Sequence, residues 1–466
     1  MSGGHRNYMS INVEEGDCTS PSAPSSPWKK ELLDVSLPEI HRSIAVPPST
    51  ASFFKKLMAY SGPGALVAVG YMDPGNWSTD IGGGSAYNYD LLFVILLSSI
   101  VAVFLQGLSV KAGIVFQRDL AQACRDAYPP VVVGTLWIIS EVAIIATDLA
   151  EVLGSAIALK LLFGCPLIVG VVITAADVLL VLMAQGRRIK VIEAIVVILI
   201  LVITVSFAMQ MFLSRPNMGE LAEGLFIPSL NTVTDPDRLF LAVSILGATV
   251  MPHNLFLHSS VILSRASDTT VSGKREAILF GVLDCTIALS LAFFVNAAIL
   301  IVAAATFYKR GYTEVADLED AYALLNPLLG SSCASVLFGV ALLAAGQNST
   351  LTGTMAGQIV MEGFMNWSID PLIRRIVTRL MAIIPAVFVI IVGGNAATNT
   401  LLLFSQVVLS FALPFAVFPL VHLTSDPEKM GNFVNNSITT YIAYIIAIVI
   451  SILNFVLLYY AVTGSG

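Results

Sequence analysis

Residue types that can hold a cation stand at two points where long apolar segments are interrupted. Asp73 and Asn76 lie in "AVGYMDPGNWSTDI" (residues 68–81), and Met251 lies in "LAVSILGATVMPHNLFLHSS" (residues 241–260). Inside a bilayer, an ionised carboxylate beside a broken backbone is costly, so it marks a functional site. A carboxylate and an amide oxygen suit a divalent cation, and a soft thioether favours Mn²⁺, Fe²⁺, Co²⁺ or Cd²⁺ over Ca²⁺ and Mg²⁺.

The two interruptions share a pattern. Aligning Asp-Pro-Gly-Asn with Met-Pro-His-Asn sets Pro74 against Pro252 and puts an asparagine two residues after each proline. One proline in a membrane helix is usually a kink, but two similar breaks with polar side chains indicate the discontinuous helices of an inverted-repeat transporter. The unwound backbone around Gly70 and Ala248 would then lie near the membrane midplane and offer carbonyl oxygens to an ion.

Three carboxylates lie in the apolar stretch "SEVAIIATDLAEVLG". Glu141, Asp148 and Glu151 fall within about 80° of one face of a helix. Acidic groups inside a membrane are rarely structural unless they are paired, and Arg379, with Arg375 as a second candidate, is the expected cationic partner. Two hypotheses follow: a route for protons, which we favour, or a buried charge network that holds helices together.

Two histidines follow the second break. His253 and His258 are five residues apart, whereas a metal-ligating pair on one helix prefers a spacing of four. The ordinary pKa of histidine, near 6.5, suits proton handling, so we expect that role for both. Asp177 and Asp284 are lone acids in other apolar stretches, and the sequence assigns them no role.

The composition places these residues in a membrane protein. Of 466 residues, 12% are charged and 56% are hydrophobic, against about 25% charged in soluble domains. Together with a mean hydropathy of +0.84, this excludes a soluble globular protein. The five cysteines show no metal-ligand spacing, so we expect neither a disulfide framework nor a structural zinc site.

Eleven stretches are apolar over about the 20 residues that a membrane-spanning helix needs, which predicts an all-α polytopic membrane protein. Lysine and arginine concentrate in alternate loops, and the positive-inside rule then puts the N-terminus in the cytoplasm. The expected divisions are a disordered cytoplasmic tail (1–50) and a transmembrane transporter domain (51–466) with repeat one (about 53–213), repeat two (about 239–423) and an extra helix (about 439–463). The predicted spans are 57–80, 91–117, 131–160, 167–184, 190–213, 239–262, 278–306, 332–362, 375–394, 399–423 and 439–463.

Three stretches carry a family resemblance. "GPGALVAVGYMDPGNWSTDI", "GATVMPHNLFLHSS" and "LLLFSQVVLSFALPFAVFPLV" resemble the natural resistance-associated macrophage protein family of proton-coupled divalent metal transporters, and most of all its bacterial manganese-transporting members. The similarity covers about residues 53–463. It implies a leucine-transporter-like fold, a 5+5 inverted repeat in which helices one and six are broken. The metal ligands that it implies are Asp73, Asn76, Met251 and the carbonyl of Ala248, with the carbonyl of Gly70 and the side chain of Gln406 joining in some states.

The resemblance also implies an activity. It is the symport of Mn²⁺ and Fe²⁺, and also of Cd²⁺ and Co²⁺, with protons toward the cytoplasm by alternating access, without enzyme chemistry, cofactor or nucleic acid. The expected partners are the transported metal ions, protons and the lipid bilayer, and a monomer is expected to suffice. No glycosylation sequon falls in a predicted outer loop, which slightly disfavours an animal surface protein. We expect the plasma membrane, with an organelle membrane as the alternative.

Three other classes of protein are weighed against this one. A sodium-coupled amino-acid symporter could share the fold, but Asp73 would repel a substrate carboxylate. A gated cation channel does not account for two paired breaks. An intramembrane zinc hydrolase would need a motif such as HExxH, and the chain offers only HNLFLH at this point.

Overall fold

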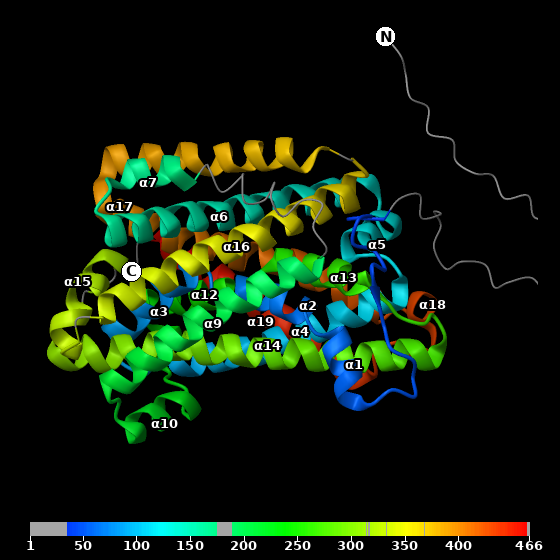
Figure 1. Cartoon of the computed structure of the whole chain (residues 1–466), viewed down its shortest axis with the longest axis horizontal. Helices are drawn as coiled ribbons and strands as arrows, with labels where there is room; N and C mark the ends of the chain where they lie inside the picture. The colour runs from blue at the N-terminus through cyan, green and yellow to red at the C-terminus, as the bar shows by residue number, and fades with distance from the viewer. Residues whose placement is uncertain are drawn as a thin grey trace, which may run out of the picture.

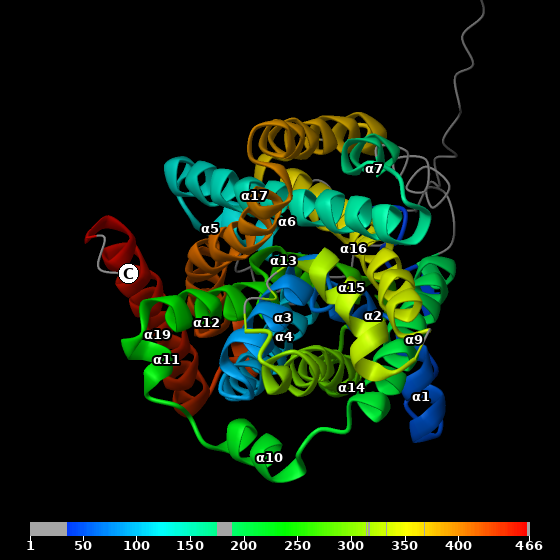
Figure 2. The same cartoon turned by 90° about the vertical axis from the view of Figure 1, so that its left-hand side faces the viewer.

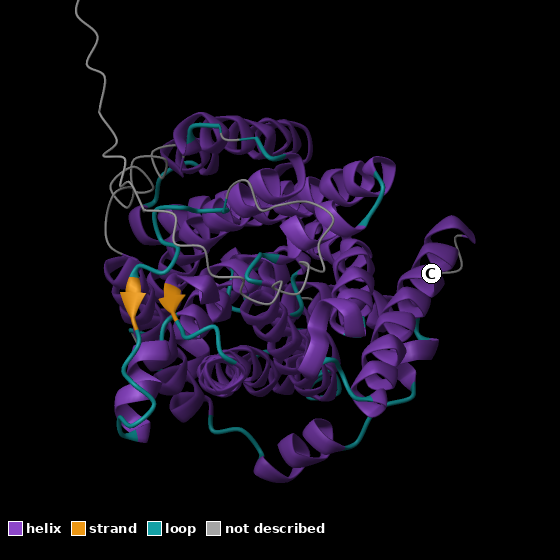
Figure 3. Cartoon of the chain, turned by 90° about the vertical axis from the view of Figure 1, so that its right-hand side faces the viewer, coloured by secondary structure: helices purple, strands orange, loops and turns teal. Residues whose placement is uncertain are grey.

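The computed structural model is a bundle of helices (Figures 1 and 2). It describes residues 35–174 and 189–463, apart from residues 314, 316, 332 and 368. In this part of the chain the β-structure is limited to β1 (Ile44–Ala45) and β2 (Arg265–Ala266), which pair in parallel (Figure 3). The prediction of an all-α protein is confirmed.

The helices follow one another in two sets, one for each expected repeat. The first set is α1 (Phe53–Tyr60), α2 (Pro63–Gly70), α3 (Pro74–Tyr87), α4 (Leu92–Phe116), α5 (Leu120–Ala127), α6 (Pro130–Phe163), α7 (Leu167–Thr174), α9 (Ile189–Ser214), α10 (Met218–Phe226) and α11 (Asn231–Thr234). The second set is α12 (Pro236–Thr249), α13 (Pro252–Val261), η1 (Ile262–Ser264), α14 (Val271–Thr306), η2 (Tyr308–Arg310), α15 (Leu318–Leu329), α16 (Ala334–Met365) and α17 (Pro371–Thr424). After these come α18 (Pro427–Met430), η3 (Gly431–Phe433) and α19 (Ser437–Thr463), which corresponds to the expected extra helix.

Proline sets both predicted breaks. It is favoured as the first residue of a helix, where its missing N–H is not needed and its fixed φ fits. Pro74 begins α3 after α2 has ended at Gly70, and Pro252 begins α13 after α12 has ended at Thr249. The four half-helices lie in the interior of the bundle in both views (Figures 1 and 2). The paired discontinuities are therefore confirmed.

Within the described residues, nine helical stretches are long and apolar enough to cross a membrane. The first predicted span, which is divided into α2 and α3, is not among them. The fourth predicted span is described only as far as Thr174, and its remainder, which includes Asp177, lies outside the described residues. The count of eleven spans stays a prediction.

The ninth and tenth predicted spans belong to one helix. The helix α17 continues for 54 residues, and its two apolar stretches are Ile376–Gly393 and Ala397–Thr424. A straight helix of that length would measure about 81 Å, far beyond the roughly 30 Å of a bilayer core. In Figure 1 the ribbon of α17 runs along one edge of the molecule and then turns down into the bundle. The spans are thus separated by a bend and not by a loop.

The expected disordered tail is shorter than predicted. Residues 35–50 are described, and they carry β1 and the buried side chain of Leu37. The prediction was wrong for this part because the Ser- and Pro-rich composition was judged over the whole tail, although Leu37, Ile40 and Ile44 supply apolar anchors near its end. Residues 1–34 lie outside the described residues.

Candidate metal site

The first break exposes backbone and side-chain oxygens. Asp73 caps α3, and its Oδ1 accepts a hydrogen bond of 2.8 Å from the backbone N–H of Asn76. The carbonyl of Gly70 would normally accept from the residue four positions later, but that residue is Pro74, which has no N–H. The proline that starts α3 therefore leaves the Gly70 carbonyl without its helical donor.

The second break repeats this arrangement. Pro252 stands four residues after Ala248, so the carbonyl of Ala248 also lacks its helical donor. Met251 is the residue before α13 and is fully buried. Its side chain packs in a cluster with Ala143 of α6 and Leu409 of α17, which puts the thioether between these two helices.

Glycines bring the two breaks together. A β-carbon at Gly70 would lie 2.2 Å from Asn254 Nδ2, so the end of α2 touches the start of α13. A β-carbon at Gly75 would lie 1.9 Å from Gln406 Nε2, and one at Gly247 would lie 2.2 Å from the backbone oxygen of Gln406. Gln406 of α17 thus contacts both α3 and α12, next to the two breaks.

Buried oxygens without hydrogen-bond partners gather on these elements. Within the described part of the chain they include Asp73 Oδ2, Asn76 Oδ1 and Gln406 Oε1, on residues that are at most 1% exposed. Buried polar atoms are nearly always paired, so orphaned acceptors at adjoining breaks fit a cation as their partner. The described residues hold no cluster of three His, Cys, Asp or Glu suited to a metal. A single carboxylate with amide, carbonyl and thioether donors is a different ligand set, and it is the one predicted.

The carboxylates of α6 have cationic partners from α17. Glu141 accepts a hydrogen bond of 2.9 Å from Arg374 and one of 3.1 Å from Trp137. Arg379 Nη1 lies 3.6 Å from Glu151 Oε2. The pairing of Arg379 with this helix is therefore found, but Glu141 is paired with Arg374, and the side chain of Arg375 lies outside the described residues.

Asp148 and Glu151 face α16. A β-carbon at Gly353 would lie 2.9 Å from Glu151 Oε1 and 3.9 Å from Asp148 Oδ1. Thr350, one turn earlier, donates a hydrogen bond of 3.1 Å to Glu151 and accepts one of 3.0 Å from Arg379. All these residues are buried, so α6, α16 and α17 enclose one continuous polar network.

The two histidines have different surroundings. The ring of His258 contacts Gln106 Oε1 at 3.0 Å, and Gln106 Nε2 donates to the hydroxyl of Tyr71 at 3.1 Å, which connects His258 to the first break. His253 is buried on α13, and α13 contacts α6. His253 thus belongs to a half-helix that packs against α6, whereas His258 contacts α4 through Gln106.

Several residues in this region were missed by sequence reasoning. Gln106 and Thr350 are buried polar residues in apolar helices. A polar residue type within an apolar stretch was the only signal that the sequence offered for them. Asp80 lies two helical turns after Asp73, is 1% exposed, and has a buried Oδ2 without a hydrogen-bond partner. In the sequence it stands in the short polar run Asn-Trp-Ser-Thr-Asp, where an acidic residue does not stand out.

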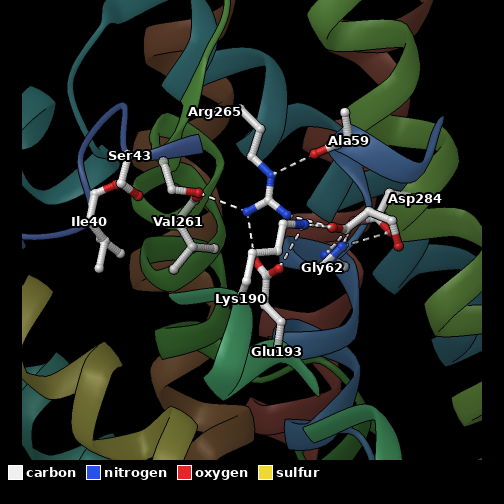
Figure 4. A network of polar contacts seen from close by, with 12 residues as sticks. Ile40, Ser43, Ala59, Gly62, Lys190, Glu193, Val261, Arg265 and Asp284 are labelled. Atoms are coloured by element: carbon white, nitrogen blue, oxygen red, sulfur yellow. Dashed lines mark hydrogen bonds and ion pairs between the residues drawn. The ribbon is translucent and has the colours of Figure 1, made fainter. Parts of the chain in front are cut away.

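A second polar network holds the start of α2 (Figure 4). Asp284 of α14 accepts hydrogen bonds from the backbone N–H of Gly62 at 3.3 Å and of Gly64 at 2.7 Å. Arg265 lies 2.6 Å from Glu193 of α9. Asp284, to which the sequence assigned no role, thus fixes α2, the first half of the broken helix, at the end away from the break.

Comparisons with known proteins agree with this architecture. The family described as natural resistance-associated macrophage protein-like matches residues 64–460. The "Divalent metal cation transporter MntH" of Listeria welshimeri is 56% identical over 436 residues, which is 94% of this chain and 97% of that protein. The protein of the same name from Nostoc sp. is 54% identical over 429 residues, 92% of this chain and 97% of that protein.

Solved structures give the same result. A crystal structure of the Eremococcus coleocola manganese transporter, in complex with an aromatic bis-isothiourea compound, superimposes with a TM-score of 0.84 at 45% identity over 90% of both chains. Mhp1, a nucleobase-cation-symport-1 family transporter, has a TM-score of 0.56 at 16% identity over 85% of this chain and 90% of its own, which concerns the fold alone. The predicted leucine-transporter-like fold is confirmed. The chain is a multi-pass membrane protein that belongs to the natural resistance-associated macrophage protein family, a family of transporters and not of enzymes.

Proposed function

We propose that the chain is a symporter that moves divalent transition-metal ions, chiefly Mn²⁺ and Fe²⁺ and also Cd²⁺ and Co²⁺, toward the cytoplasm with protons by alternating access. The observation that carries this proposal is the donor set at the two breaks. It combines the carboxylate of Asp73, the orphaned amide oxygens of Asn76 and Gln406, and the thioether of Met251. The related proteins described as metal cation and manganese transporters support the same cargo.

The donor set fits a transported ion better than a resident one. A divalent ion on Asp73 would keep a net positive charge, because the amide, carbonyl and thioether ligands are neutral. The carbonyls of Gly70 and Ala248 belong to the ends of helices that adjoin the break, so a shift of either half-helix changes the coordination. Such a site binds in one arrangement and releases in another, as alternating access requires.

The proton route is assigned to the network beside the site. Asp148 and Glu151 are buried side by side against Gly353, and Arg379 Nη1 lies 3.6 Å from Glu151 Oε2. Glu141 is on the same helix and is paired with Arg374, and His253 is buried on α13, which contacts α6. Because the metal and a proton compete for Asp73, the arriving ion would displace a proton toward these groups. His258 reaches the first break through Gln106 and is proposed as a further proton-handling residue.

We also propose the setting of this activity. The protein works in the plasma membrane with its N-terminus in the cytoplasm, a monomer suffices, and no cofactor is needed because the metal ions and protons are substrates. The bacterial origin of the related metal transporters supports the plasma membrane.

An uptake assay in proteoliposomes tests this function. We expect uptake of Mn²⁺, Fe²⁺ and Cd²⁺, but not of Mg²⁺ or Ca²⁺, and faster uptake when the outside is acidic. The measurement uses a metal-sensitive dye inside the vesicles, at two external pH values, against empty vesicles. Uptake of an amino acid instead of Mn²⁺ would contradict the proposal.

The Met251→Ala variant is expected to change selectivity more than rate. A thioether contributes little to binding the fairly hard Mn²⁺ but more to binding soft Cd²⁺, and it keeps a hard oxygen ligand out of that position. We therefore expect Mn²⁺ uptake to persist, Cd²⁺ uptake to fall by about tenfold or more, which is about 1.4 kcal/mol, and Ca²⁺ to compete.

Leu409→Ala is the matched control, because it removes a side chain from the same packing cluster without removing sulfur. If Met251→Ala leaves the order of metals unchanged, Met251 has only a packing role.

A further inference from the structure

The described end of the N-terminal segment is fixed to the transporter at several points. We define residues 35–45 as the N-terminal strap. The backbone N–H of Leu37 donates a hydrogen bond of 3.0 Å to Glu362 at the end of α16. The backbone N–H of Arg42 donates one of 2.9 Å to the carbonyl of Leu263, and its side chain donates one of 3.2 Å to the carbonyl of Ser267. The strap therefore spans the ends of α16 and α13.

The strap pairs directly with the residue that holds the start of α2. In the β1–β2 pair, Ile44 is the partner of Arg265. The side chain of Arg265 donates to the carbonyl of Ser61 at 2.5 Å and to that of Ala59 at 3.3 Å, and it lies 2.6 Å from Glu193. Figure 4 shows this guanidinium among its partners. The strap thus fixes the backbone of the arginine whose side chain fixes the α1–α2 junction.

We propose that the N-terminal strap is a conformational latch that keeps α2 against the bundle and limits how often this end of the transporter opens. The proposal rests on the alternating-access function proposed above, in which the half-helix α2 has to separate from its neighbours to release the ion. The strap does not touch the metal site, so its effect is on the opening equilibrium and not on metal coordination.

The strap has enough contacts to stabilise the closed arrangement of α2, but few enough that it can detach. Its ladder has only two residues on each strand, and a two-stranded pair is marginal by itself. Leu37 is its buried apolar anchor, at 8% exposure, whereas Glu39 is exposed. Segments with few buried contacts open locally at low free energy, which is the property that a latch needs.

The strap acts through Arg265 and not by pulling on α1. The linker between β1 and α1 is residues 46–52, and seven extended residues reach at most about 25 Å. That length leaves room for α1 and α2 to move while the strap stays in place. The strap therefore acts by fixing the backbone of Arg265. The side chain of Arg265 has to break its hydrogen bond to the carbonyl of Ser61 when α2 moves.

The chain contains a natural reporter of this motion. Cys285 of α14 is fully buried, and a β-carbon at Gly64 of α2 would lie 2.8 Å from the backbone nitrogen of Cys285. Separation of α2 from α14 uncovers this thiol. In a full-length protein whose other cysteines (Cys18, Cys124, Cys165 and Cys333) are replaced by serine, the rate of reaction with a water-soluble maleimide measures the opening.

The experiment compares two deletions in the purified protein. Deletion of residues 2–45 removes the strap, and deletion of residues 2–34 keeps it and is the matched control. We expect Cys285 to react about tenfold faster without the strap, equivalent to about 1.4 kcal/mol in the opening equilibrium, and at the unchanged rate in the control. Equal rates in both deletions would overturn the proposal.

A point variant covers the case in which the longer deletion does not fold. Leu37→Ser removes the buried anchor, and Glu39→Ser changes an exposed neighbour. We expect faster alkylation of Cys285 only in Leu37→Ser, and the same rate in both variants would contradict the latch. The assay needs no metal, so its failure is distinct from failure of the transport function, which the uptake assay measures.

Discussion

Asp73→Asn is expected to abolish metal uptake while the protein still folds. Asparagine keeps the shape and can still cap α3 through its side-chain oxygen, so the break is preserved. It removes the formal negative charge from a buried donor set whose other members are neutral. We expect Mn²⁺ uptake to fall by more than about a hundredfold, because even the loss of an outer-shell partner of a metal ligand costs about 10- to 100-fold.

The measurement is Mn²⁺ uptake in proteoliposomes together with Mn²⁺ binding by calorimetry. Asp90→Asn is the control, because Asp90 is also an aspartate of the first repeat but is paired with Arg238 and partly exposed. It should keep normal uptake. Substantial uptake by a well-folded Asp73→Asn protein would remove Asp73 from the site.

Asp148→Asn is expected to separate proton movement from metal binding. Asp148 is buried on the face of α6 that adjoins Gly353, and it is not a metal ligand in the proposed site. Asparagine preserves its size but cannot accept and release a proton. Proton flux should therefore fall by at least about tenfold, a barrier increase of about 1.4 kcal/mol, while Mn²⁺ affinity stays near that of the unmodified protein.

Two dyes in parallel vesicles, one for pH and one for metal, measure both fluxes, and calorimetry measures Mn²⁺ binding. If proton flux persists at the normal level while Mn²⁺ entry is lost, the α6 route is wrong. The acids would then belong to the alternative that the sequence also allowed, a charge network that joins α6, α16 and α17.

The parts of the site that the sequence predicted share one physical cause. Proline followed by polar residues inside an apolar stretch favours a helix break, and a charged residue beside it in a membrane needs a partner, so the breaks that carry Asp73, Asn76 and Met251 could be predicted without a structure. Their role as metal ligands stays a prediction. The pairing of Arg379 with the α6 carboxylates was found in the same way, from the cost of burying a charge.

The parts that the sequence could not predict depend on how each helix is rotated about its axis and on which helices contact one another. Adjacent residues on a helix point about 100° apart, so the sequence could not decide that Arg374 reaches Glu141. The link from His258 through Gln106 to Tyr71 joins α13 and α4 to the turn between α2 and α3, and spacing along the chain carries no information on it. The strap could not be predicted, because the average composition of residues 1–50 does not reveal the few apolar residues that anchor the end of this segment.

The prolines at the two breaks have a consequence for how ligands are found by mutagenesis. Two of the proposed oxygen donors are backbone carbonyls, at Gly70 and Ala248, and no side-chain replacement there removes the oxygen. Whether each carbonyl is free depends on the residue four positions later, Pro74 or Pro252. A residue with an N–H at either position could re-form the helical hydrogen bond and withdraw the oxygen. In an alanine scan, the loss of these two proposed backbone ligands would therefore appear on replacement of Pro74 or Pro252, and not on replacement of Gly70 or at Ala248.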